Sequence, residues 1–164
     1  MKIRNGFVSN SSSSSFIVAL DKKPQNKDDV KQIFYRGAVR SCNCCTEKLE
    51  ETDKLSKILW DDIRKQKPTK SVKKLADTIS KGSVLDCLEP DSDDYVDRKT
   101  LKGWEKYQLA RDKYSELMAE MFINANKKRH IYIFHYGDED GNIYGHLEHG
   151  DTFEFVRHLT ICCH

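Results

Sequence analysis

The stretch that decides the fold is Ser11-Ser12-Ser13-Ser14-Ser15-Phe16-Ile17-Val18-Ala19-Leu20, in which a serine run leads directly into an apolar run. A serine run alone is typical of a flexible linker. This one lies between Phe7-Val8 and five apolar residues, so we interpret it as part of a built element. Polar residues bound residues 16–20 on both sides, which predicts a short buried strand there.

Length and composition bound the class of protein. The chain has 164 residues, 38% hydrophobic and 33% charged, and this length suits one domain with one core. Twenty-eight basic and 26 acidic residues leave a net charge of +2, so a nucleic-acid partner is not indicated. No apolar run approaches the ~18 residues that a membrane helix needs, and no apolar stretch of the length typical of a signal peptide stands before the serines. We therefore expect a cytoplasmic protein without a membrane partner.

The middle of the chain has helical patterning. Apolar residues at helical spacing predict helices over about 27–35, 53–65, 69–80 and 99–126. Asn26 is expected to cap the first of these helices and Thr69 the third. Along the last helix the expected apolar stripe is Leu101, Trp104, Tyr107, Tyr114, Leu117, Met118, Met121 and Phe122.

The C-terminal region changes to strand-like patterning. Residues 131–136 predict a strand, Asp140-Gly141 a turn, and residues 142–147 a returning strand that completes a hairpin. Residues 153–155 and 158–163 predict further strand. The expected fold is a single α+β domain over 1–164. Its mainly antiparallel sheet is formed by the N-terminal strand and the C-terminal hairpin and strands, packed with a helical middle.

The histidines suggest a metal site, because all six lie between His130 and His164. Side chains alternate along a strand, so His135, His146 and Glu148 are predicted to share the face of the hairpin opposite the core side. Two imidazoles and a carboxylate suit Zn²⁺ or another divalent transition metal, with a position left for water. The candidate ligand set is His135, His146, Glu148, His149 and His158. The alternative is a set of surface or hydrogen-bonded histidines.

The serines and cysteines each leave two interpretations open. Ser11, Ser12, Ser13, Ser14 and Ser15 could form an anion-binding nest of backbone N–H groups and hydroxyls, or could satisfy local backbone groups. The cysteine-rich segments 42–45 and 162–164 could meet in a structural zinc site, or could hold reduced thiols. The spacing of neither segment matches a zinc knuckle.

The opening of the chain resembles a known group. Gly6-Phe7-Val8-Ser9-Asn10, the serine run and Phe16 are similar to the start of uncharacterised proteins from large tailed bacteriophages and some bacteria. The resemblance implies a phage-type accessory or host-interaction protein that binds a host or phage protein in the infected or carrying cell. It transfers no catalytic residues. The alternative function is a metal-dependent hydrolase that uses the histidine cluster, so the sequence leaves open whether the protein is an enzyme.

Overall fold

The computed structural model describes residues 13–36, 48–82, 101–137, 147 and 151–163. The predictions for residues 1–12, 37–47, 83–100, 138–146, 148–150 and 164 therefore lie outside the described residues. The described fold is α+β with an antiparallel sheet, as predicted. In chain order, the helices and strands are β1 (Ser13–Leu20), α1 (Lys27–Tyr35), α2 (Lys48–Lys65), α3 (Val72–Ile79), α4 (Leu101–Ala125), β2 (His130–Gly137), η3 (Asp151–Phe153) and β3 (Arg157–Cys163).

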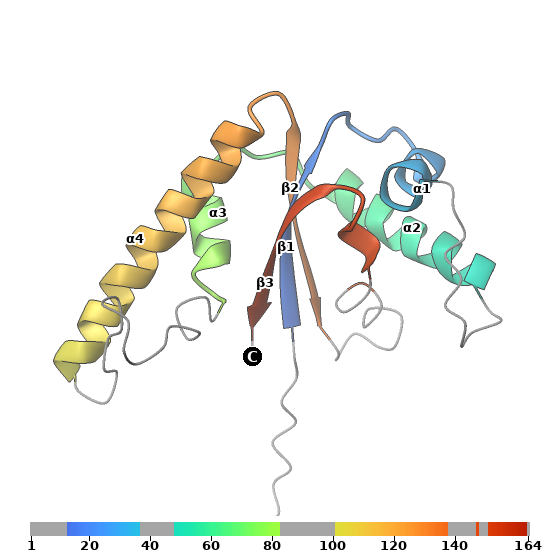
Figure 1. The fold of residues 1–164 in the computed structure, drawn as a ribbon. Coiled ribbons are helices and arrows are strands. Elements are labelled where there is room, and N and C mark those ends of the chain that lie inside the picture. The colour runs from blue at the N-terminus through green and yellow to red at the C-terminus, as the bar shows by residue number, and fades with distance from the viewer. Residues whose placement is uncertain (1–12, 37–47, 83–100, 138–146, 148–150, 164) are drawn as a thin grey trace, which may run out of the picture.

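The N-terminal strand β1 is the centre of the sheet. It pairs antiparallel with β2 on one side and with β3 on the other (Figure 1). The prediction that the two ends of the chain share a sheet is confirmed. The strand begins at Ser13, earlier than the apolar run, because Ser13, Ser14 and Ser15 also have partners in both neighbouring strands.

The predicted C-terminal hairpin needs correction. β2 and β3 do not pair with each other, since β1 lies between them. Most of the predicted returning strand, residues 142–146, lies outside the described residues, and Leu147 is helical instead of extended. The strand predicted at 153–155 is also wrong. A strand would place Phe153 and Phe155 on one face, whereas the turn after η3 buries Phe153 and leaves Phe155 against the Arg36 guanidinium.

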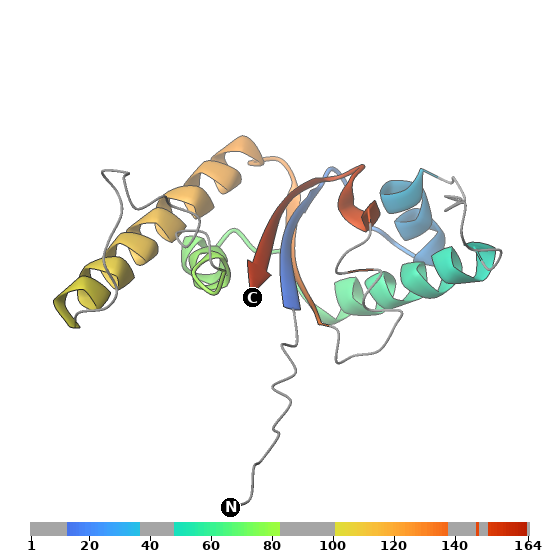
Figure 2. The same cartoon turned by 60° about the horizontal axis from the view of Figure 1, so that its bottom comes forward.

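Helices cover both faces of the sheet. α1 and α2 lie against one face, and α3 and α4 lie against the other (Figures 1 and 2). This explains why residues 16–20 are apolar without alternation, since side chains on both faces of β1 are buried. Phe16, Val18 and Leu20 join the core of the α1–α2 side. Ile17 and Ala19 join the core of the α3–α4 side.

The second core corrects our expectation for His135. We expected its face of β2 to lie opposite the core side. The structure shows Ile131 buried on that same face under α3 and α4, so this face is also a core face at the Ile131 end of β2, while His135 itself is exposed. Tyr132, Phe134 and Leu147 are buried on the other face, as predicted.

Local capping interactions fix the helix starts. The Asn26 side chain accepts a hydrogen bond from the Asp29 N–H at 2.8 Å, which confirms the predicted cap of α1. The predicted cap of α3 is wrong by two residues. Ser71 caps that helix by accepting from the Lys74 N–H at 3.3 Å, while the Thr69 hydroxyl accepts from the Ser71 N–H.

Candidate functional site

The serine run and a histidine meet across the sheet. Ser15 on β1 is the register partner of His135 on β2, and Ser15 Oγ lies 2.7 Å from His135 Nδ1. Burial lowers the pKa of His135, and the positive charge of Lys81 lowers it further. His135 as a whole is exposed, but its contact with Ser15 is partly buried. The ring is therefore held mainly neutral while it is bonded to a buried hydroxyl.

The same register bears on the predicted anion nest. Ser13, Ser14 and Ser15 are extended strand residues, paired on both sides of β1. A nest needs successive N–H groups that converge, whereas the N–H groups of a central strand point alternately to its two neighbours. These three serines do not form one. Ser11 and Ser12 lie outside the described residues.

The predicted metal ligands are only partly described. His158 on β3 is the partner of Val18, on the face of the sheet opposite His135. Its Nδ1 lies 3.0 Å from the Val156 carbonyl oxygen, and its ring lies 6.1 Å from that of Phe153. His135 and His158 therefore cannot share one ion. The other candidates, His146, Glu148 and His149, lie outside the described residues.

No group of three or more histidine, cysteine or acidic residues is placed to hold a metal within the part of the chain that the structure describes. The zinc site stays a prediction that depends on residues outside that part. The same is true of the cysteine site, whose first half, residues 42–45, is not described.

The outer edge of β2 is partly covered by the chain itself. The Thr69 N–H donates to the Ile131 carbonyl at 2.9 Å, and the Ile133 N–H donates to Gln66 Oε1 at 3.3 Å. The Tyr136 hydroxyl donates to Asp62 at 3.1 Å near the other end of the strand. The first two contacts use backbone groups of β2 that could otherwise pair with another strand, so this part of the edge is protected against pairing.

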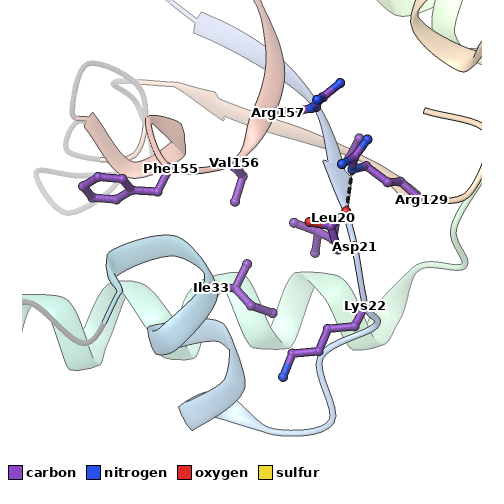
Figure 3. A pocket seen from close by; sticks show the side chains of 9 residues that line it. Leu20, Asp21, Lys22, Ile33, Arg129, Phe155, Val156 and Arg157 are labelled. Carbon is purple, nitrogen blue, oxygen red and sulfur yellow. Dashed lines mark ion pairs between the residues drawn. The ribbon is translucent and has the colours of Figure 1, made fainter. Parts of the chain in front are cut away.

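A pocket opens at the opposite end of the sheet, where β1 ends and β3 begins (Figure 3). Its volume is about 410 Å³. Leu20, Ile33 and Val156 give it an apolar surface, and Lys22, Arg129 and Arg157 bring positive charge. We call it the arginine pocket. Sequence analysis missed it, because its residues come from four separate segments and follow no local motif.

Helix α4 presents a second unexpected surface. Leu117 and Met121 belong to the apolar stripe expected along this helix, and they are 53% and 57% exposed. Tyr107 and Phe122 of the expected stripe are buried. Ser115 and Ala119, which the stripe did not include, are buried as well. Two small residues one turn apart let α4 pack closely on α3, which rotates the larger side chains outward. The spacing of Ser115 and Ala119 was the signal that would have revealed this face.

Apolar side chains recur at a regular spacing on the outer part of α4. Ala110, Tyr114, Leu117 and Met121 are separated by four, three and four residues, and we call them the α4 stripe. Tyr114 is half-buried and the other three are exposed. Leu109 is 72% exposed and lies off this spacing. Near the helix start, Trp104 is exposed and stacks on Tyr107 with ring centroids 5.5 Å apart. The stripe is thus a continuous apolar row on the surface of the helix.

No protein-family model, curated protein or solved structure matches this chain. Among the described helices, none combines the length and the apolar composition that crossing a bilayer requires.

Proposed function

We propose that the chain is a phage-type accessory protein that acts by binding a protein partner through the α4 stripe, in the cytoplasm of the bacterial cell. The observation that carries this proposal is the exposure of Leu117 and Met121, one turn apart on the same helix. Single exposed apolar residues are common on protein surfaces, whereas contiguous ones favour an interaction site.

The spacing of the stripe points to a helical partner. Alternating steps of three and four residues place side chains along one seam, which is the pattern that packs against a second helix. A partner helix laid along the stripe would cover Tyr114, Leu117 and Met121 with its own apolar face. A recognition helix in a groove uses the same i, i+3, i+4 and i+7 anchors.

The charges beside the stripe favour an acidic partner. Along one side of the stripe lies a row of exposed charged residues at a spacing of seven: Lys106, Lys113 and Glu120. Two of these three are basic, and neither lysine takes part in an ion pair among the described residues. An amphipathic helix with carboxylates beside its apolar face would complement this surface.

The phage assignment is supported by the opening of the chain. Residues 2–16 resemble the start of phage and bacterial proteins, and that resemblance is the reason to look for the partner among host and phage proteins. The partner would then be met inside the infected or carrying cell. The α4 stripe is the proposed binding surface, and the resemblance is the reason to propose a bacterial cell as the place where the partner is bound.

The test is affinity capture with a matched pair of variants. The full chain is immobilised, and proteins are captured from a lysate of infected cells and identified. Leu117→Glu places a charge in the stripe, and Leu109→Glu makes the same change off the stripe. We expect one protein with an acidic amphipathic helix to be retained by the wild type and by Leu109→Glu, and to be lost with Leu117→Glu.

The proposal is contradicted if no protein is retained, or if Leu117→Glu retains the same protein as the wild type. Size-exclusion chromatography of the purified chain gives a second check. If the wild type is a dimer and Leu117→Glu is a monomer, the stripe serves self-association and the proposed partner is wrong. Because Leu117 is exposed, both variants are expected to melt at the temperature of the wild type.

A further inference from the structure

The arginine pocket carries an excess of positive charge. Lys22, Arg129 and Arg157 line it together with one carboxylate, Asp21. Arg129 Nε forms an ion pair with Asp21 at 2.6 Å, which accounts for one of the three cations. Arg157 takes part in none of the ion pairs among the described residues. Unmatched cations that border a concave surface attract an anionic ligand.

Arg129 is held in place before any ligand arrives. Its N–H donates to the Asn126 carbonyl at 2.9 Å, in the turn that follows α4. Its Nη1 donates to Asn126 Oδ1 at 3.3 Å. Asn126 is buried, and its side chain donates to the Phe122 carbonyl at 2.8 Å. A guanidinium fixed in this way loses little conformational freedom on binding.

Arg157 is fixed by the sheet at its backbone. It is the first residue of β3 and the register partner of Ala19. Register partners share a face of the sheet, so Arg157 lies on the α3–α4 face with Ala19, whereas Leu20, Ile33 and Val156 belong to the α1–α2 side. Figure 3 shows the Arg129 and Arg157 side chains together at the end of the sheet, with Ile33 across the pocket from them. The charged and apolar parts of the pocket are therefore separated in space.

The apolar part is large enough for an organic group. Leu20 is fully buried beneath it, and Ile33, Val156 and the ring of Phe155 contribute further apolar surface. The volume of about 410 Å³ lies within the range of roughly 300–1,000 Å³ that is typical of small-molecule sites. Such sites combine an apolar lining with a small number of placed polar groups.

We propose that the arginine pocket binds a small organic anion, with a carboxylate or phosphate head at Arg129 and Arg157 and an apolar body against Leu20, Ile33 and Val156. A planar guanidinium matches the oxygens of either head group by paired hydrogen bonds. This site is independent of the α4 stripe, so it stands whether or not the stripe binds a protein.

In the experiment, the isotope-labelled full chain is titrated with each of four probes, and binding is measured from the NMR chemical shifts of the protein. Phenylpropionate and phenyl phosphate each combine an anionic head with an apolar body. Phenylpropanamide keeps the apolar body without the charge, and inorganic phosphate keeps the charge without the apolar body. We expect at least one of the two organic anions to shift Leu20, Ile33 and Val156, and the other two probes to bind at least tenfold more weakly.

Two variants locate the site. Arg157→Ala should weaken binding of the organic anion by tenfold or more. Arg64→Ala removes the same charge from the exposed surface of α2 and should leave binding unchanged. If Arg157→Ala does not show a cooperative melting transition, the variant Lys22→Ala is used instead. Lys22 is exposed, and its replacement should also weaken binding of the organic anion.

Three results would overturn the proposal. The first is that neither organic anion binds at millimolar concentration. The second is that the neutral amide binds as tightly as the anions. The third is that the folded pocket variant binds as tightly as the wild type.

Discussion

The contact between Ser15 and His135 joins the two ends of the chain at the level of single residues. The serine hydroxyl forms a hydrogen bond with an imidazole nitrogen that would otherwise be partly buried without a partner. The serine at this position is therefore part of the sheet. Its sequence neighbours gave no hint of this partner, which lies 120 residues away along the chain.

The lowered pKa of His135 has a consequence for stability. Because burial and Lys81 disfavour the imidazolium in the folded protein, the unfolded chain binds this proton more readily. The stability that depends on a neutral His135 is thus fully present above the unfolded pKa, near 6.5, and is lost as the pH falls through the folded pKa.

An NMR titration of the His135 ring protons measures this directly. We expect a midpoint below that of the same residue in the urea-unfolded chain. Lys81→Gln removes one of the two causes and should raise the midpoint part of the way back. A folded midpoint equal to or above the unfolded one would contradict the account of this contact.

At the scale of the element, the residue that caps α3 differs between the sequence-based prediction, Thr69, and the structure, Ser71. Ser71→Ala removes the acceptor for the Lys74 N–H and is expected to destabilise the protein by about 0.5–2 kcal/mol. Ser80→Ala, at the exposed C-terminal end of the same helix, is the control and should cost less. Urea unfolding measures both changes. If Ser71→Ala costs no more than Ser80→Ala, Ser71 is not the cap.

Element types were more predictable than their faces and partners. α1 has the bounds that the sequence predicted, because Asn26 and the apolar residues Val30 and Phe34 are strong local signals. α4 exists as predicted and buries Tyr107 and Phe122 of the expected stripe, but it leaves Leu117 and Met121 exposed. It also buries Ala119 against Leu75 and Ala76 of α3, a tertiary contact that the sequence pattern does not show. The strand predicted at 153–155 failed because two aromatic residues suit a turn as well as a strand when one of them fills a core.

At the scale of the whole molecule, Phe153 holds the α1–α2 side together. Its ring stacks on Phe16 of β1 at 4.4 Å and meets Phe34 of α1 edge-on at 5.7 Å and Phe134 of β2 at 5.6 Å. The short helix η3 therefore supplies a core residue that contacts two neighbouring strands, β1 and β2, and one helix, α1. Such a ring contributes through its large buried area as well as its pairing geometry.

Phe153→Ala is expected to lower the free energy of unfolding by about 3–5 kcal/mol, because it leaves a cavity between these rings. Phe155→Ala is the matched control. Phe155 is only half-buried and contacts the Arg36 guanidinium, so its loss should cost clearly less. Chemical denaturation of both variants measures the difference. Equal costs would show that Phe153 is not central to this core.

The order of the sheet and the location of the arginine pocket were beyond local sequence signals. Placing β1 between β2 and β3 depends on helices that cover both faces, and each of those contacts joins distant parts of the chain. The pocket combines the end of β1, α1, the turn after α4 and the start of β3. Only the folded chain brings Arg129 and Arg157 to one side of it.

Hydrogen–deuterium exchange of the chain, alone and with its captured partner, tests the central claim most directly. Peptides that cover Ala110 to Met121 of α4 should exchange more slowly in the complex, while peptides of α1 and α2 should be unchanged. Protection confined to any other element, with the α4 stripe unaltered, would contradict the account.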